Sequence, residues 1–215
     1  MTTLITGANR GIGRALLDQS RAAGDLTFGT ARTVMDNLLQ LDVANASSVK
    51  ILAKELKDQP LDLLVCNAGV YLDKGDTLAA GYESDKWADT FAINVTGVFL
   101  TIQALLPNLR AAQNARIAII SSQMASDTNA PGGSYIYRAS KAAALNLGRN
   151  LASDLKPEGI AVGIYHPGWV QTDMGGASAA ITVDEAATGL LQRFAALNIA
   201  TTGCFETWDG RAHPY

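Results

Sequence analysis

The sequence predicts an open α/β fold, in which a mainly parallel β-sheet carries helices on both faces. One observation behind this prediction is the alternation of short apolar or β-branched runs with longer helical patterns along the chain. A second is a glycine-rich turn between the first such run and the first helical pattern. A third is the mostly apolar run at residues 61–65, which is typical of a strand that is covered on both faces.

The composition predicts a single domain, residues 1–215, because this length suffices for one core and no repeat or low-complexity linker divides it. A net charge of −3 gives no basis for nucleic-acid binding. The two cysteines, Cys66 and Cys204, fit neither a metal cluster nor a disulfide scaffold, so we expect no metal. We expect no signal peptide before the first strand and no apolar run of membrane-spanning length. We therefore expect a soluble, cytoplasmic protein without membrane association.

The first strand, turn and helix predict a phosphate site. A strand at residues 2–6 leads into Gly7-Ala8-Asn9-Arg10-Gly11-Ile12-Gly13, and an amphipathic helix follows at residues 14–23. Glycines let backbone N–H groups approach a pyrophosphate, and the helix N-terminus favours its negative charge. Ordinary tight turns also use glycine, but the strand–turn–helix context favours a dinucleotide site here.

The end of the second strand, residues 26–30, bears on the type of dinucleotide. An acidic side chain at this point would bind the adenosine ribose 2′-hydroxyl, whereas a basic one suits a 2′-phosphate. Arg32 follows this strand, and no carboxylate occurs between the end of the strand and Asp36. Together with Arg10 in the glycine turn, it favours NADP(H) over NAD(H). The alternative is that both arginines are solvated surface residues.

The middle of the chain continues the alternation. A strand at residues 38–41 ends in Asp42 and Val43, and its connection from the second strand is too short for a full crossover helix. A helix at residues 47–57 follows, with Ser47 or Ser48 as its expected cap. After the strand at residues 61–65, we expect Asn67 of Asn67-Ala68-Gly69 to bond backbone across the sheet and Gly69 to permit close approach of a cofactor.

A long helical pattern at residues 87–109 contains Asn94, which needs hydrogen-bond partners if it is buried, and Pro107, which we expect to bend or end the helix. The strand at residues 116–120 delivers Ser121 and Ser122 to its carboxyl end, where ligands bind in open α/β sheets.

The run at residues 134–145 predicts a helix on which Tyr137 and Lys141 lie one turn apart on the same face. A nearby ammonium favours a phenolate, and lowering the pKa of a tyrosine from ~10 to ~7 takes roughly 4 kcal/mol. Tyr137 is therefore a candidate proton donor. Since this spacing is common by chance, a surface pair without chemistry remains the alternative at this point.

The last third of the chain predicts a strand at residues 160–165, a helix at residues 183–197 and a short strand at residues 203–206. Between the first two lie Pro167, Gly168 and a stretch of small residues at 175–180. Such a stretch has little apolar area to bury, so we expect it to be a mobile lid over an open substrate pocket.

Four motifs occur in an order that resembles the short-chain dehydrogenases/reductases. They are Thr6-Gly7 with Gly11-Ile12-Gly13, Asn67-Ala68-Gly69, Tyr137 with Lys141, and Pro167-Gly168. Residues 203–215 resemble the carbonyl-reductase branch that the C-factor-like and sniffer-like proteins typify. The resemblance implies a doubly wound, Rossmann-type sheet of seven mainly parallel strands in the order 3-2-1-4-5-6-7.

The resemblance also assigns roles to individual residues. Tyr137 would donate or accept the proton, and Lys141 would lower its pKa and hold the nicotinamide ribose. Ser122, with Ser121 as the weaker candidate, would bond the substrate carbonyl, and Asn94 would support a water-linked proton relay to Lys141. The implied cofactor contacts are Gly7, Asn9, Arg10, Gly11, Ile12, Gly13, Arg32, Asp42, Val43, Asn67, Ala68, Gly69, Tyr137, Lys141, Pro167, Gly168, Val170 and Thr172.

We therefore expect an NADPH-dependent oxidoreductase that reduces the carbonyl of an aldehyde or ketone, or oxidises the corresponding alcohol, by hydride transfer. Its partners would be this small-molecule substrate and further copies of the chain, as a dimer or tetramer. One alternative is an NAD-dependent alcohol dehydrogenase of the same fold. Another is a dinucleotide-binding signalling or regulatory protein whose turnover is incidental.

Overall fold

A computed structural model describes residues 1–35 and 37–215. They form one seven-stranded sheet in the order β3-β2-β1-β4-β5-β6-β7, and all neighbouring strands in it are parallel. This confirms the predicted strand order and sharpens the expectation of a mainly parallel sheet. The strands are β1 (Thr2–Ile5), β2 (Leu26–Ala31), β3 (Leu39–Gln40), β4 (Leu63–Cys66), β5 (Arg116–Ile120), β6 (Ala161–His166) and β7 (Phe205–Thr207).

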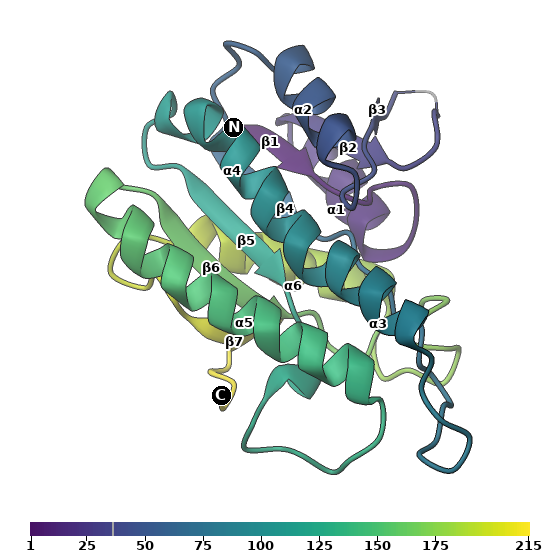
Figure 1. The fold of residues 1–215 in the computed structure, drawn as a ribbon. Helices are drawn as coiled ribbons and strands as arrows, with labels where there is room; N and C mark the ends of the chain where they lie inside the picture. Colours follow the sequence, from purple (N-terminus) through teal and green to yellow (C-terminus); the bar gives the residue numbers. More distant parts are fainter. Residues whose placement is uncertain (36) are drawn as a thin grey trace.

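Helices cover both faces of the sheet, as the doubly wound architecture requires (Figure 1). They are α1 (Gly11–Ala22), α2 (Ala46–Glu55), α3 (Ser84–Phe91), the π-helical turn η1 (Ala92–Thr96), α4 (Gly97–Arg110), α5 (Tyr135–Leu155) and α6 (Val183–Ala196), with short 3₁₀ turns η2 (Gln123–Ala125) and η3 (Lys156–Glu158). Figure 1 shows α4 and α5 in front of the sheet and α6 behind it.

The two layers arise from the alternation of side chains along each strand. In β4, Leu64 and Cys66 pack into a cluster with residues of α2, α4 and α5, whereas Leu63 and Val65 pack on the opposite face with α1 and α6. All four are almost completely buried. Because both faces of this strand are covered, its apolar run has little room for polar residues, which is the signal that the sequence showed.

The N-terminus of α2 corrects one expectation. Asn45, rather than Ser47 or Ser48, caps the helix: its side-chain oxygen accepts from the backbone N–H of Ser47 at 2.9 Å and of Ser48 at 3.2 Å. Such a cap contributes about 1 kcal/mol to stability. The Ser48 hydroxyl instead accepts from the Asp42 N–H at 3.0 Å, which ties the residues after β3 to the helix.

The long helical pattern begins at Ser84 and continues through α3, η1 and α4 to Arg110, so Pro107 lies inside α4 without ending it. This stretch of 27 residues contains an 18-residue window with a mean hydropathy of 1.5, so by length and composition it could cross a membrane. The expectation that no such run exists is therefore wrong on length and composition. A core helix of a soluble protein meets the same criterion, and here Val98, Ile102 and Leu105 are buried in a cluster with the sheet.

Candidate active site

The predicted site residues gather at one edge of the sheet, because the strands are parallel and all their carboxyl ends meet there. Asn94 lies in η1, and Tyr137 and Lys141 lie in the first two turns of α5. The remaining predicted residues follow individual strands: 7–13 after β1, Arg32 after β2, Asp42 and Val43 after β3, 67–69 after β4, Ser122 after β5, and Pro167, Gly168, Val170 and Thr172 after β6.

The glycine turn has the geometry of an anion cradle. Gly7 and Gly11 have φ angles of +67° and +53°, which L side chains rarely adopt. A Cβ at Gly13 would lie 2.2 Å from the Gly7 carbonyl oxygen, so only glycine lets α1 start this close to β1. In the described chain no side chain caps the N-terminus of α1. A pyrophosphate would satisfy its free N–H groups, so the turn fits a dinucleotide.

Asn67 braces this cradle from the neighbouring strand, as the sequence predicted. Its side-chain N–H group donates to the carbonyl oxygens of Thr6 at 2.9 Å and Gly7 at 3.1 Å. The Thr6 hydroxyl in turn accepts from the backbone N–H groups of Asn67 and Ala68, both at 3.0 Å. These four bonds join the ends of β1 and β4 and fix the backbone at the point of closest cofactor approach.

The two arginines on which the predicted choice of dinucleotide rests are both exposed. Arg32 is exposed just beyond β2. Arg10 is also exposed, and its guanidinium forms an ion pair with the carboxylate of Asp173, which follows β6. Val43 is buried against Gly97, where a Cβ would lie 2.9 Å from the Val43 side chain. The sequence did not predict the partner of Arg10, because 163 positions separate the two residues.

Asn94, Lys141 and Gly69 form the inner end of the site. A Cβ at Gly69 would lie 3.2 Å from Asn94 Oδ1 and 3.5 Å from Lys141 Nζ, so glycine avoids crowding these two buried polar groups. Asn94 is buried, and its amide bonds the N–H and carbonyl of Val70, both at 2.9 Å, and the Ser140 hydroxyl at 3.0 Å. It therefore finds the partners that a buried amide needs.

Tyr137 and Lys141 are neighbours, but they do not form the predicted phenolate–ammonium pair. Lys141 Nζ lies 5.6 Å from the Tyr137 ring centroid and donates to the Ile120 carbonyl oxygen at 2.9 Å. Burial raises the pKa of Tyr137 to about 12, opposed by the nearby Ser122 hydroxyl, and lowers the pKa of Lys141 to about 8. Burial thus raises the pKa of Tyr137 instead of lowering it as expected, because loss of water disfavours both charged forms.

Of the two serines after β5, the structure favours Ser122 as the one that can meet a substrate. The Ser121 hydroxyl is buried and donates to the Lys141 carbonyl oxygen at 3.0 Å. The Ser122 hydroxyl accepts from the Met124 N–H at 3.1 Å and lies close enough to the Tyr137 hydroxyl to oppose the rise in its pKa. An accepting hydroxyl keeps its own proton available, so Ser122 and Tyr137 present two O–H donors.

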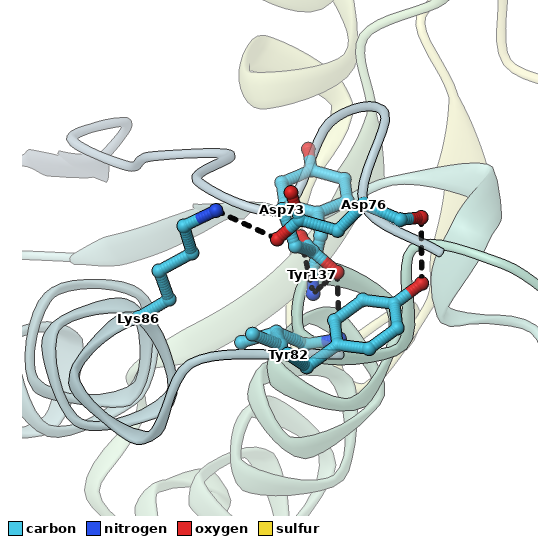
Figure 2. Close-up of polar contacts among 6 residues, drawn as sticks. Asp73, Asp76, Tyr82, Lys86 and Tyr137 are labelled. Carbon is cyan, nitrogen blue, oxygen red and sulfur yellow. Dashed lines mark hydrogen bonds and ion pairs between the residues drawn. The ribbon is translucent and has the colours of Figure 1, made fainter. Parts of the chain in front are cut away.

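Sequence reasoning missed two residues of the loop between β4 and α3. The Tyr71 ring stacks on the Tyr137 ring, with centroids 4.3 Å apart and planes at 21°. Asp73 is fully buried, and its carboxylate accepts from the backbone N–H groups of Ile136 and Tyr137 (Figure 2). The only sequence signal was a carboxylate and an aromatic residue shortly after the carboxyl end of β4, and local spacing does not connect them to α5.

The rest of this loop is anchored at the base of α3. Lys86 forms an ion pair with Asp76 at 2.7 Å, and the Tyr82 hydroxyl donates to the Asp76 carbonyl oxygen at 2.9 Å (Figure 2). The Tyr82 ring also meets the Tyr135 ring edge-on, with centroids 5.3 Å apart. The loop that contacts Tyr137 therefore has attachments on both α3 and α5.

The stretch of small residues after β6 is better connected than we expected. The Trp169 indole N–H donates to the Gly175 carbonyl at 2.9 Å, and the Gly176 N–H donates to the Thr172 carbonyl at 2.7 Å. Lys74, from the loop after β4, donates to the Met174 carbonyl at 3.0 Å. The stretch has little apolar area, as predicted, and these hydrogen bonds attach its backbone to the neighbouring loops. Its mobility and the openness of the pocket stay predictions.

The sequence and the fold are both similar to those of known proteins. A family model described as short chain dehydrogenase matches residues 1–181. The chain belongs to the short-chain dehydrogenase/reductase family. It is thus an oxidoreductase of a family that uses NAD(P)(H), and several similar solved structures are described as NADPH- or NADP-bound.

Several members of the family resemble this chain over most of its length. The C-signal of Myxococcus xanthus is 39% identical over 158 residues, which cover 73% of this chain and 93% of that protein. The carbonyl reductase Sniffer of D. melanogaster has a TM-score of 0.93 and 30% identity, covering 100% of this chain and 99% of the other. An NADPH-bound carbonyl reductase from chicken fatty liver has a TM-score of 0.90 and 29% identity, covering 100% and 98%.

Proposed function

We propose that this enzyme reduces the carbonyl group of an aldehyde or ketone with NADPH, or catalyses the reverse oxidation. The observation that carries the proposal is the convergence of Tyr137, Ser122, Lys141 and Asn94 at the edge of the sheet beside Gly69. Three of the similar solved structures are described as carbonyl reductases, which supports this direction of reaction.

The bound cofactor would supply the hydride. As hydride reaches the carbonyl carbon, negative charge develops on the oxygen, and the neighbouring Tyr137 and Ser122 hydroxyls would donate to it. A pKa of about 12 keeps Tyr137 protonated at neutral pH, so it is available as the acid in the reductive direction. Removing one such donor typically costs about 3–4 kcal/mol of transition-state stabilisation.

Lys141 and Asn94 would support this proton transfer without contacting the substrate carbonyl. Lys141 Nζ, with a pKa of about 8, remains mostly protonated at pH 7 and can bind the ribose hydroxyls of the cofactor. Asn94 Oδ1 lies on the same side of Gly69, where it can orient a water molecule that returns a proton towards Lys141. Both roles depend on the absence of a side chain at Gly69.

NADPH should be preferred over NADH because Arg32 and Arg10 are the cations near the end of β2 and the glycine turn. Charge-assisted hydrogen bonds contribute about 1.5–3 kcal/mol each, which corresponds to roughly 10- to 100-fold discrimination. Fluorescence titration of both cofactors measures it directly. The Arg32→Asp variant should lose affinity for NADPH selectively, and equal or tighter binding of NADH by the wild type would contradict the assignment.

The experiment that tests the activity is NADPH depletion by purified protein with a panel of aldehydes, ketones and quinones. We expect turnover of at least one carbonyl class in the wild type and a loss of about 100-fold or more in the Tyr137→Phe variant. NADPH binding without turnover of any carbonyl would instead favour oxidation of an alcohol, which the same assay detects with NADP⁺ or NAD⁺ and a panel of alcohols.

A second candidate function is a dinucleotide-binding signalling protein with incidental turnover, because one similar protein is named C-signal. The presence of Ser122 and Asn94 argues against a purely binding role, since binding a dinucleotide does not require them. If the Tyr137→Phe protein kept its full biological activity in the cell, this second reading would gain support over the first.

A further inference from the structure

Asp73 is a buried carboxylate that the chemistry proposed above does not use. It is 0% exposed, and no cation forms an ion pair with it in the part of the chain that the structure describes. Its oxygens accept from the Ile136 N–H at 2.8 Å and from the Tyr137 N–H at 3.2 and 3.4 Å. Burying an anion is unfavourable unless hydrogen bonds compensate it, and here the two backbone amides supply them.

These contacts make Asp73 the cap of α5. The residue at the usual cap position, Ser134, has a φ of +48° and, within the described residues, makes no side-chain bond to the helix N-terminus. Its hydroxyl is instead hydrogen bonded to the Tyr71 hydroxyl. A carboxylate from the loop after β4 therefore accepts from the free N–H groups of the helix and lies at the positive end of its dipole.

One of the two capped amides belongs to Tyr137 itself, so the cap acts directly on the residue that would donate the proton. Tyr71, two residues before Asp73, stacks its ring on the Tyr137 ring at 4.3 Å. One loop thus fixes both the backbone and the ring plane of Tyr137. Figure 2 shows the first of these contacts, between Asp73 and the Tyr137 backbone. A displacement of a reacting group by 1 Å can lower a rate by about 100-fold.

We propose that Asp73 is a positioning residue for Tyr137, which it places by capping the N-terminus of α5 from the loop after β4. It does not contact substrate in this role, because its oxygens are buried and bonded to the helix amides. The kinetic test of this inference rests on the carbonyl-reductase function proposed above, whereas a second, spectroscopic test does not.

The kinetic test compares Asp73→Ala and Asp73→Asn with Asn45→Ala, a control that removes the cap of α2. Asp73→Ala should lower kcat by about 10- to 100-fold, while the Kd for NADPH and the KM stay within about 3-fold of wild type. Asp73→Asn keeps one acceptor oxygen and should recover most of kcat, and Asn45→Ala should lower the melting temperature with kcat unchanged. Wild-type kcat in Asp73→Ala, or an equal loss in Asn45→Ala, would overturn the inference.

The spectroscopic test follows ionisation of Tyr137 by tyrosinate absorbance after a rapid jump to pH 11, with Tyr137→Phe proteins as backgrounds. With a pKa of about 12, Tyr137 should be about one-tenth ionised in an otherwise wild-type protein. If Asp73 positions the tyrosine in its buried place, Asp73→Ala should raise this fraction several-fold, and Asn45→Ala should not.

The two tests separate the failures. An unchanged Tyr137 ionisation in Asp73→Ala refutes the positioning role whatever the enzyme reduces. If Tyr137 ionisation shifts in Asp73→Ala but the wild-type protein turns over no carbonyl, the positioning role is supported and the proposed substrate class is rejected. If Asp73→Ala does not fold, Asp73→Asn decides: an ionised fraction and a kcat that match the wild type support the cap, and a full loss of kcat contradicts it.

Discussion

Replacing Lys141 with methionine should change how the stability of the cofactor-free protein depends on pH. The Lys141 ammonium is 5% exposed, and burial lowers its pKa from 10.5 to about 8. In the unfolded chain the side chain regains its ordinary pKa. Methionine has a similar length and no titratable group, so the variant removes this proton-linked contribution alone.

Whether the free energy of unfolding rises or falls with pH depends on which state binds more protons. Below pH 8 both folded and unfolded states carry the ammonium, and the folded state bears its full desolvation cost. Between pH 8 and 10.5 the folded state releases the proton while the unfolded chain retains it, so stability rises with pH. Each pH unit in this window adds about 1.4 kcal/mol, so the wild type should gain about 1.4 kcal/mol between pH 7 and 9 relative to Lys141→Met.

Urea unfolding of both proteins at several pH values from 6.5 to 9.5 measures this difference. The lost hydrogen bond to the Ile120 carbonyl shifts the variant by a nearly constant amount, so it does not affect the slope. Other groups with shifted pKa values, such as the buried Cys66 thiol, are common to both proteins and cancel. Parallel stability curves would refute the reasoning, since they would mean that Lys141 is not desolvated in the folded protein.

Three further predictions concern the site. Tyr137→Phe should lower kcat by about 100-fold or more with the Kd for NADPH within 2-fold, because the phenol proton matters only in the transition state; steady-state kinetics and fluorescence titration separate the two. Gly13→Ala should lower the melting temperature and abolish cofactor binding, because the added Cβ would lie 2.2 Å from the Gly7 carbonyl oxygen; wild-type affinity would contradict the cradle geometry. Asp173→Asn should tighten NADPH binding about 2- to 10-fold and NADH binding less, because it frees Arg10 from its exposed ion pair; calorimetric titration checks this, and weaker NADPH binding would show that Asp173 orients Arg10 instead.

Local sequence determined the elements and their order. The strand–turn–helix around Gly7 and the spacing of Tyr137 and Lys141 could be interpreted directly, because backbone freedom and helical periodicity act over four or five residues. The carboxyl-edge rule then placed the strand-following residues together without any coordinates. Asn67 illustrates the limit of this method: a bond to backbone across the sheet was expected, but only the structure identifies its partners as the carbonyl oxygens of Thr6 and Gly7.

Where several local partners compete, the sequence was less decisive. Ser47, Ser48 and Asn45 are all good caps, and only the path of the chain after β3 selects Asn45. Ser121 and Ser122 are chemically identical, and the alternation of side chains turns the first towards the Lys141 carbonyl and the second towards Tyr137.

Tertiary structure alone decided the electrostatics of the site and the cap of its principal helix. The pKa of Tyr137 depends on how much water the fold removes around it, and the removal outweighs the cation that the sequence placed one turn away. Asp73 caps α5 although it lies 63 positions before Ile136 and 64 positions before Tyr137 in the sequence. Sequence periodicity specifies which residues share a face of one element, whereas the partners that elements bring to one another depend on how the whole sheet and its loops pack.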